Sequence, residues 1–247
     1  MDPTLCLVSE SLELSLHTIL YSRQLYPSSI FSPTTFLGLQ IHVCRHDKIN
    51  KYIADTVRVA AEGIIGGDVD CVVLTFVDEE ANRFASLQTS QSIQGTETTM
   101  TTSTSTVRGE FQNGILERFV FDFDSSLLRE HVNQNNNNNN NKNNKNKFPP
   151  KSLSSSFRNL LLRLTTTPPR TYPGSTTFRL GVQLADVTRE EVEKNEVLCE
   201  ALGGVEWYEE EKRNIYVERD RGIMKPIKSV VSRDEGISLE VYVEKVI

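Results

Sequence analysis

The residues best placed to bind a metal ion are His42, Cys44 and His46, which alternate along one segment. Alternate residues of a β-strand share a face, so two of these side chains could hold one ion. No fourth ligand of matching type lies nearby in the sequence. Ordinary packing and surface roles explain the same residues and are the favoured interpretation, so we expect no metal and no cofactor.

Sequence patterns that carry catalysis or phosphate binding are missing. The chain has no G-x-S-x-G elbow, no Walker A loop and no G-x-G-x-x-G fingerprint. Paired carboxylates occur at Asp122 and Asp124, which alternate along an expected strand, and in residues 209–211, a charged run typical of a solvated loop. These patterns favour a non-catalytic protein. The alternative is an enzyme built around the His42 to His46 strand, because catalytic groups can meet in space without being adjacent in sequence.

Composition and charge limit the class of partner. The 247 residues include 27 Lys and Arg against 33 Asp and Glu, for a net charge of -6 and a pI near 5.4. This balance argues against direct nucleic-acid binding, so a link to DNA would run through another protein. No apolar run is long enough for a membrane span, and the first residues do not resemble a secretory signal. We expect an intracellular protein without membrane contact, whose cysteines at positions 6, 44, 71 and 199 are reduced and mostly buried.

Two polar tracts interrupt the sequence. Residues 88–112 are rich in Thr, Ser, Gln and Gly, and residues 133–147 are Asn with interspersed Lys. Neither tract offers an apolar face, so both are predicted to be disordered surface insertions. What remains has the size of a single compact domain, and we predict one domain over residues 1–247.

Hydrophobic periodicity predicts an alternation of helices and strands. Helices are expected over residues 5–25, 47–66, 153–164 and, from a capping box at Thr188, 188–203. Strands are expected over residues 37–44, 71–77, 176–184, 214–218, 228–232 and 238–244. The apolar run 71–77 is typical of the middle of a sheet, and residues 82–87 and 115–123 could be two arms of a hairpin whose loop is the Thr/Ser tract. This mixture indicates an α+β fold with a mostly antiparallel sheet packed on about three helices.

Residues 17–27 and 49–56, followed in order by several later segments, resemble HORMA domains. Residues 17–27, which end in Leu25-Tyr26-Pro27, resemble the first-helix motif of the family, and residues 49–56 resemble the second helix of one branch. That branch is the non-catalytic HORMA subunit of DNA polymerase zeta. The similarity continues through residues 70–78, 116–121, 226–229 and 241–244. The spindle-checkpoint branch usually has Gly where this chain has Gln24.

The resemblance implies a binding module. In the family the C-terminal segment, residues 205–247 here, acts as a safety belt that folds over an extended, proline-containing peptide of the partner. The pocket for that peptide matches Tyr52, Trp207 and Met224, the last standing where the family usually has Leu. From its pattern alone, Trp207 would instead be a buried core anchor.

Other surfaces follow from the same resemblance. Glu240 and Tyr242 match positions that bind the scaffold deoxycytidyl transferase of translesion synthesis. Arg158 matches an arginine at a HORMA dimer surface, although an ordinary solvated helix residue explains it equally well. A remodelling ATPase of the AAA+ class is a further implied partner. The expected function is a nuclear adaptor that joins the catalytic subunit of polymerase zeta to the scaffold polymerase in DNA damage tolerance, and the alternative is a spindle-checkpoint HORMA protein with a different closure peptide.

Overall fold

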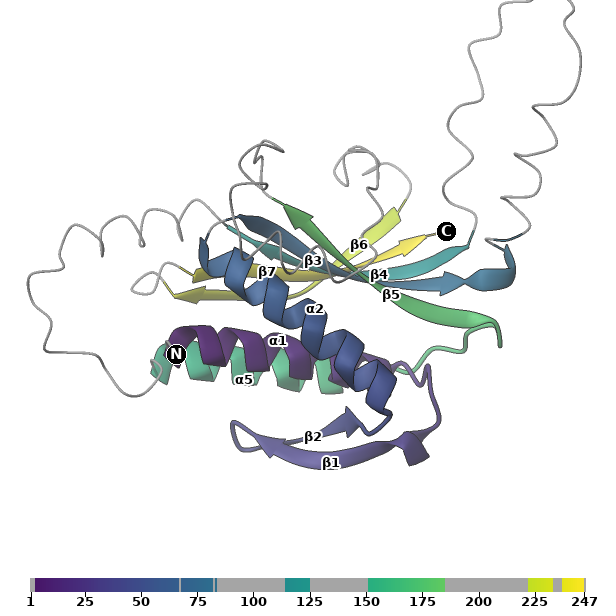
Figure 1. Ribbon diagram of the computed structural model, residues 1–247, viewed down its shortest axis with the longest axis horizontal. Helices are drawn as coiled ribbons and strands as arrows, with labels where there is room; N and C mark the ends of the chain where they lie inside the picture. The colour runs from purple at the N-terminus through teal and green to yellow at the C-terminus, as the bar shows by residue number, and fades with distance from the viewer. Residues whose placement is uncertain are drawn as a thin grey trace, which may run out of the picture.

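The computed structural model describes residues 3–66, 68–81, 83, 114–124, 151–184, 222–232 and 237–246. Its helices are α1 (Pro3–Ser22), the 3-10 helix η1 (Ser28–Ile30), α2 (Asp47–Gly66) and α5 (Lys151–Thr165). Its strands are β1 (Phe31–Phe36), β2 (Leu39–Cys44), β3 (Val69–Asp78), β4 (Ile115–Phe123), β5 (Thr176–Leu184), β6 (Gly222–Ser232) and β7 (Ile237–Val246). Figure 1 shows their arrangement.

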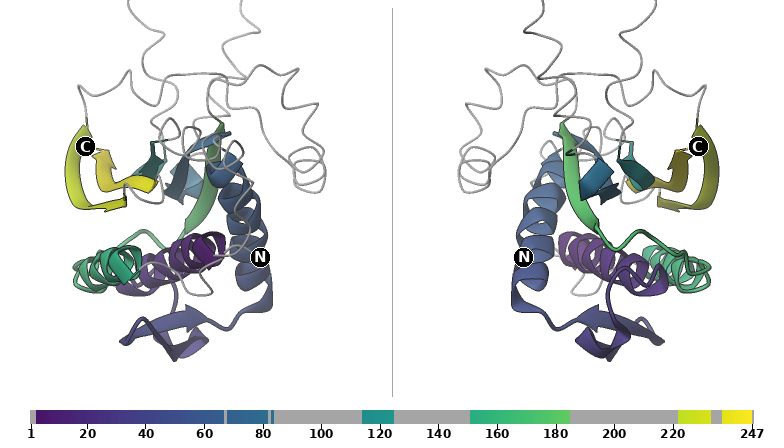
Figure 2. Two further views of the ribbon diagram at one scale, coloured as in Figure 1. Left: turned by 90° about the vertical axis from the view of Figure 1, so that its left-hand side faces the viewer. Right: turned by 90° about the vertical axis from the view of Figure 1, so that its right-hand side faces the viewer.

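The main sheet has five strands in the order β5-β3-β4-β7-β6, and every neighbouring pair is antiparallel. Helices α2, α1 and α5 lie side by side against one face of this sheet (Figure 2). Strands β1 and β2 form a separate hairpin on the side of α1 and α5 that faces away from the sheet (Figure 1). The antiparallel α+β fold predicted from the sequence is therefore confirmed.

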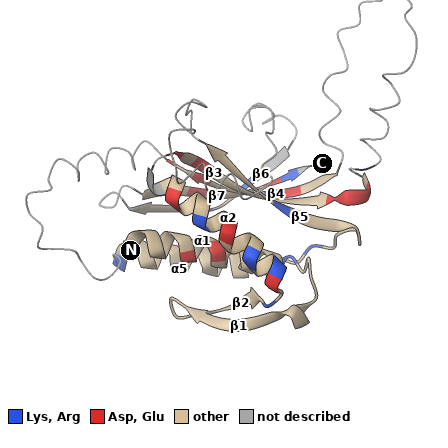
Figure 3. Cartoon of the chain, in the orientation of Figure 1, with Lys and Arg blue, Asp and Glu red and all other residues tan. Residues whose placement is uncertain are grey.

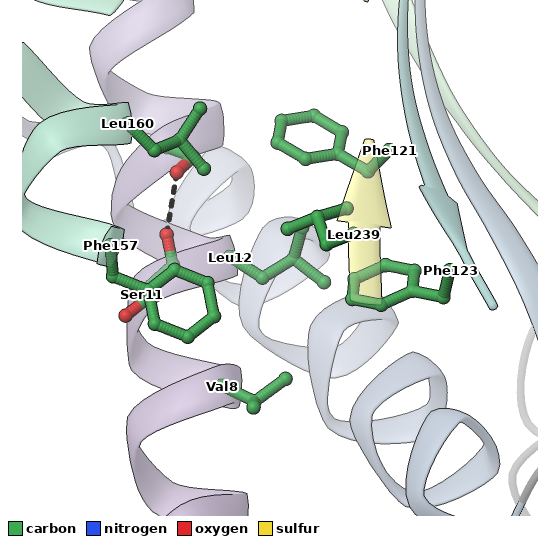
Figure 4. A pocket seen from close by; sticks show the side chains of 9 residues that line it. Val8, Ser11, Leu12, Phe121, Phe123, Phe157, Leu160 and Leu239 are labelled. Carbon is green, nitrogen blue, oxygen red and sulfur yellow. Dashed lines mark hydrogen bonds between the residues drawn. The ribbon is translucent and has the colours of Figure 1, made fainter. Parts of the chain in front are cut away.

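The core fills the space between the helices and the sheet. Helix α1 buries Val8, Leu12, Leu16 and Ile19, which recur at helical spacing, and it packs between α2 and α5. Figure 4 shows the contact of α1 with Phe157 of α5 and with strands β4 and β7. The space left there is too small to hold a water molecule, so this part of the molecule is packed interior.

Helix α2 is amphipathic. Its buried residues Ile53, Val57, Ala60 and Ile64 face the core, and acidic and basic residues are interspersed along the helix (Figure 3). This distribution of apolar and charged side chains is what makes a surface helix stable in a globular fold. The helix predicted over residues 47–66 is confirmed with both its ends.

The first hairpin differs from the prediction. Strand β2 begins at Leu39, two residues later than expected, because Leu37 and Gly38 form the turn with φ angles of 48° and 72°. Positive φ at both turn residues matches the mirror-image turns that join short hairpins. The partner strand β1 was not predicted, since Pro33 and the exposed residues beside it hide the alternation.

The connection from β3 to β4 also differs. Strand β3 is interior, but the middle strand of the sheet is β4. Strand β3 itself pairs with β4, so the predicted arm over residues 82–87 is wrong where the structure describes it: residues 79–81 and 83 are helical. The Asp78 carboxylate starts this helical turn by accepting hydrogen bonds from the amides of Glu80 and Ala81.

The remaining predicted elements divide into two groups. Helices α1 and α5 and strands β5, β6 and β7 lie where the sequence placed them, with shifts at their ends. Outside the described residues lie both polar insertions (88–112 and 133–147), the helix 188–203, the strand 214–218 and Cys199. Among the other cysteines, Cys44 and Cys71 are buried and Cys6 is exposed. In the described part of the chain, no helix is long and apolar enough to cross a membrane.

Candidate functional site: the outer edge of strand β5

The two outermost strands of the sheet have different edges. Strand β6 carries Lys225, Pro226 and Lys228, and its pairing with β7 shifts register at this point. Lysine, proline and bulges are the devices by which proteins prevent an edge strand from pairing further. Strand β5 contains neither proline nor lysine; it carries the exposed Arg179, its register with β3 shifts beside Val69, and within the described residues it pairs only with β3. As far as the described residues go, the outer edge of β5 is therefore open to another strand.

Tyr52 of α2 stands at this open edge. Its hydroxyl accepts a hydrogen bond from the backbone amide of Leu180 at 3.0 Å, so this amide points away from β3. The Tyr52 ring lies 5.8 Å from the ring of Phe178 and is 37% exposed. A backbone donor of the edge strand is thus satisfied by a solvent-accessible side chain that an incoming backbone could replace.

The inward side chains of β5 give the edge an apolar floor. Phe178 is buried, while Leu180, Val182 and Leu184 are half-buried and pack against the core from alternate positions. Tyr26, at the end of the segment after α1, meets the ring of Phe178 edge-on at 6.2 Å. Burial raises the pKa of Tyr26, which keeps its hydroxyl protonated. Main-chain groups in line with half-buried apolar side chains are what an added strand requires.

A buried carboxylate anchors the loop that leads into β5. Glu117 of β4 is fully buried, forms an ion pair with Arg23 at 2.9 Å and accepts a hydrogen bond from the Tyr172 hydroxyl at 2.7 Å. Arg170 approaches the same carboxylate at 3.6 Å. Burial, together with the bond to Glu117, raises the pKa of Tyr172. These contacts tie residues 168–172 to the middle of the sheet and so set where β5 begins.

A second contact fixes the start of β5. The Ser175 hydroxyl donates a hydrogen bond to Asp78 at the end of β3, at 2.7 Å. This bond, followed by the amides of the helical turn, lowers the pKa of Asp78. The edge strand is therefore held by β3 just before its first residue, Thr176, and by Glu117 through the preceding loop.

Comparison with known proteins decides the family. The family model for the HORMA domain matches residues 4–182. This chain belongs to the HORMA domain family. The resemblance seen in the sequence is thereby confirmed.

Relatives of this HORMA protein match over a limited length. The human mitotic spindle assembly checkpoint protein MAD2B is 34% identical over 71 residues, 29% of this chain and 34% of that protein. MAD2B of Danio rerio is 31% identical over 74 residues, 30% of this chain and 35% of the relative. MAD2A of Dictyostelium discoideum is 32% identical over 72 residues, 29% of this chain and 36% of the relative. The chain thus spans about a third of the length of the curated relatives it matches.

Solved structures share the HORMA fold. The crystal structure of the mitotic checkpoint complex aligns with a TM-score of 0.60 at 15% identity, covering 98% of each chain. The Caenorhabditis elegans protein HTP-2 bound to the HIM-3 closure motif aligns with a TM-score of 0.56 at 10% identity, covering 96% of this chain and 88% of that one. At these identities the similarity concerns the fold alone.

The structure separates the residues that the HORMA resemblance assigned to the peptide pocket. Tyr52 lies at the β5 edge, whereas Met224, 45% exposed, lies on β6 with β3, β4 and β7 between that strand and β5. Trp207 lies outside the described residues. Tyr52 and Met224 are therefore not brought together in this structure.

The other predicted surfaces lie elsewhere on the HORMA domain. Glu240 is exposed and Tyr242 is buried; as alternate residues of β7 they share a face. Tyr242 packs there with Cys71, Val73 and Val120, a cluster separate from the main core. Burial raises the pKa of the Cys71 thiol, so it stays protonated. Arg158 is exposed on α5.

The structure places the alternating residues His42, Cys44 and His46 in three different surroundings. His42 stacks on Tyr21 with ring centroids 3.9 Å apart, and Cys44 is buried with its amide directed at Nδ1 of His17. His46 is exposed. No group of three or more His, Cys, Asp or Glu residues in the described part of the chain could hold a metal ion.

Sequence reasoning missed the role of Glu117. A signal was present: Glu117 shares its strand face with Phe119, Phe121 and Phe123, all of which are buried. A charged residue at an inward position of an apolar strand requires a buried partner. The identity of that partner, Arg23, could not be read from the sequence because 94 residues separate the two.

Proposed function

We propose that this chain is a non-catalytic adaptor that captures a proline-containing peptide of the catalytic subunit of DNA polymerase zeta and joins it to the scaffold deoxycytidyl transferase of translesion synthesis. The adaptor acts in the nucleus in DNA damage tolerance. The open edge of β5 carries the proposal. There an extended peptide adds one strand to the sheet, its main chain supplying affinity and its side chains specificity.

Peptide capture at β5 is supported by the contrast between the two edges. The β6 edge is defended by Lys225 and Pro226, and the β5 edge presents an amide that only the Tyr52 hydroxyl occupies among the described residues. HORMA proteins of the same fold, such as HTP-2, bind closure motifs. Because the peptide must be enclosed by the belt, its association and release should be slow.

The peptide's identity is tested by fluorescence-anisotropy titration with two labelled peptides, one from a polymerase zeta catalytic subunit and one of the checkpoint type. The adaptor function predicts tight, slow binding of the first peptide alone. Tyr52→Ala should weaken this binding because it removes the aromatic ring that lines the edge beside Phe178. Tyr21→Ala, a matched loss of an aromatic ring on the opposite side of the helices, should leave it unchanged. Binding of neither peptide would contradict the proposal.

The belt residues are tested in the same titration. Trp207→Ala should abolish binding with the fold kept, as measured by circular dichroism. Met224→Ala separates two arrangements, because this residue lies across the sheet from Tyr52. Loss of affinity in Met224→Ala would mean that β6 moves to reach the peptide, and unchanged affinity would remove Met224 from the pocket.

Partner surfaces outside the peptide site belong to the proposal as well. Glu240 and Tyr242 on β7 would meet the scaffold polymerase, and Arg158 on α5 would lie in a HORMA dimer, with an AAA+ ATPase remodelling the closed complex. Glu240→Lys should abolish co-elution with the C-terminal domain of the scaffold polymerase while the zeta peptide still binds.

Arg158→Ala should shift a dimer to monomer in sedimentation. A fluorescent fusion that stays outside the nucleus would contradict the proposed location.

A second candidate function is a spindle-checkpoint role. The names of the matched relatives, mitotic spindle assembly checkpoint proteins MAD2B and MAD2A, favour it. Both functions would use the β5 edge, so they differ only in the peptide. Preference for the checkpoint-type peptide in the titration would assign the chain to this branch.

A further inference from the structure

The loop between α5 and β5 contains an unusual four-residue sequence, Thr167-Pro168-Pro169-Arg170. The chain has nine prolines, and a serine or threonine precedes only two of them, Pro33 and Pro168. Only Thr167 also has a basic residue three positions later; the third residue after Ser32 is Thr35. We propose that Thr167 is the target of a proline-directed protein kinase, and that its phosphate draws Arg170 away from Glu117.

The local backbone makes Thr167 available. Helix α5 ends at Thr165, and a residue that precedes proline is kept out of the helical conformation. Thr167 is half-buried; among the described residues its hydroxyl donates to the carbonyl of Arg163 at 3.3 Å, in an exposed position, and its amide donates to the carbonyl of Leu164 at 3.1 Å. Pro168 and Pro169 are exposed and favour an extended chain. Binding of this segment to a kinase in extended form costs these two hydrogen bonds and the one between the Pro168 carbonyl and Arg23.

Arg170 is the weakest partner of the buried carboxylate. Its Nη1 atom lies 3.6 Å from Glu117 Oε1 and donates to the carbonyl of Leu116 at 3.3 Å, with the side chain 35% exposed. Arg23 by contrast is 2.9 Å from the same carboxylate and buried. Arg170 can thus move away from Glu117 while Arg23 stays paired with that carboxylate. It follows Thr167 by three residues, within reach of a phosphate there.

Phosphorylation would change the charge at this point. The γ-phosphoryl group of Mg-ATP is transferred to Oγ1 of Thr167, the bond to the departing ADP breaks, and the hydroxyl proton passes to the catalytic base of the kinase. The product carries a charge of about -1.5 to -2 beside the carbonyl end of α5, where a negative charge is unfavourable. Arginine binds phosphate in a two-pronged geometry that is stronger than a single long contact. Arg170 is the cation that this phosphate would recruit.

The consequence reaches the β5 edge. Arg170 packs over the ring of Tyr172, whose hydroxyl binds Glu117, and β5 begins at Thr176. The carbonyl of Pro168, next to the phosphate, accepts from the buried Arg23. Moving Arg170 therefore loosens the loop that holds β5. That a loosened β5 binds peptide less tightly rests on the proposed function.

The phosphorylation site is tested with the purified full chain, radiolabelled Mg-ATP and a cyclin-dependent kinase. Kinases of this class require proline directly after the acceptor residue and prefer a basic residue two positions after that proline. The wild-type chain should incorporate phosphate, which mass spectrometry should locate at Thr167, and the Thr167→Ala variant should not incorporate it. Ser32→Ala, the matched control, and Thr167→Ser should retain incorporation. Arg170→Ala should slow incorporation, and Arg170→Lys should restore it. Incorporation that is equal in Thr167→Ala, or missing in wild type, would overturn the site.

The switch is tested by hydrogen exchange on phosphorylated and unphosphorylated chains. Amides of β5 should exchange about tenfold faster after phosphorylation, the effect of losing one charged hydrogen bond, while β1 and β2 stay unchanged. Arg170→Ala should show the faster exchange without phosphate. Unchanged β5 exchange would overturn the coupling to Glu117. Neither measurement uses a peptide, so a failure of the proposed function in the anisotropy titration would be seen separately.

Discussion

The guanidinium of Arg23 and the carboxylate of Glu117 form an ion pair inside the protein, with Nε and Oε2 2.9 Å apart and side chains 4% and 0% exposed. Arg23 comes from the segment just after α1, and Glu117 from the middle strand of the sheet. Arg23 also lies 5.1 Å from the centre of the Phe119 ring. The pair therefore joins the helical layer, the sheet and the loop before β5.

Glu117→Gln should strongly destabilise the fold. Glutamine keeps the shape but leaves Arg23 buried without a counter-charge, and breaking a buried pair in this way costs about 3–5 kcal/mol. The free energy of unfolding in urea measures the loss. The control is Glu244→Gln. Glu244 lies 4.0 Å from the half-exposed Arg118, and burial raises the pKa of the Glu244 carboxyl. This substitution should cost less than about 1 kcal/mol. Equal losses would show that the buried pair has no special role.

Tyr52→Phe should expose the amide of Leu180 to exchange with solvent. The change removes the acceptor at 3.0 Å but keeps the ring that contacts Phe178. Hydrogen exchange at Leu180 should become faster while global stability falls by no more than about 1 kcal/mol. Tyr21→Phe, whose ring stacks on His42, should leave this amide unchanged. A protected Leu180 amide in Tyr52→Phe would mean that another group covers the edge.

Acid should weaken the protein through His17. Burial lowers the pKa of this fully buried histidine to about 4, despite the opposing effect of Asn50, whereas in the unfolded chain it is near 6.5. Between these values only the unfolded state binds the proton. Stability is therefore complete above about pH 6.5 and falls as the pH drops toward 4, by up to about 3 kcal/mol.

His17→Gln removes that contribution, so its unfolding free energy should fall less steeply between pH 6.5 and 4 than that of the wild type. His46→Gln, at an exposed position, should keep the wild-type slope. Urea unfolding at several pH values gives the comparison. An equal dependence of the unfolding free energy on pH in wild type and His17→Gln would show that His17 does not cause the loss of stability in acid.

Gly63→Ala should destabilise the protein although alanine is the better helix former. A Cβ at this position in α2 would lie 2.5 Å from Cγ2 of Val69, the first residue of β3. Overpacking of this kind costs about 1–3 kcal/mol. Thermal unfolding should show a lower midpoint. In the double variant Gly63→Ala, Val69→Ala the penalty should be smaller than the sum of the two single changes; additive losses would exclude the clash.

Much of the fold could be predicted from local pattern. The apolar spacing of α2 and α5 predicts a helix, because a helix buries every third or fourth residue. The alternation of β5 predicts a strand, because a strand buries every second residue. The Thr-Pro-Pro-Arg sequence and the family motifs are also properties of the chain itself. Strand β1 escaped because its proline and threonines lie on an exposed hairpin, where burial imposes no pattern.

Long-range pairing was decided only by the tertiary structure. Which strand lies at an edge depends on the order β5-β3-β4-β7-β6, which is a property of the folded sheet with its helices on one face. The same packing places Tyr52 beside Leu180 and Glu117 beside Arg23, pairs that are 128 and 94 residues apart. Residue types thus fixed which groups needed a partner, while the partner itself depended on contacts that no local pattern encodes. Met224 shows the limit, since its motif match placed it with Tyr52 and the strand order separates the two.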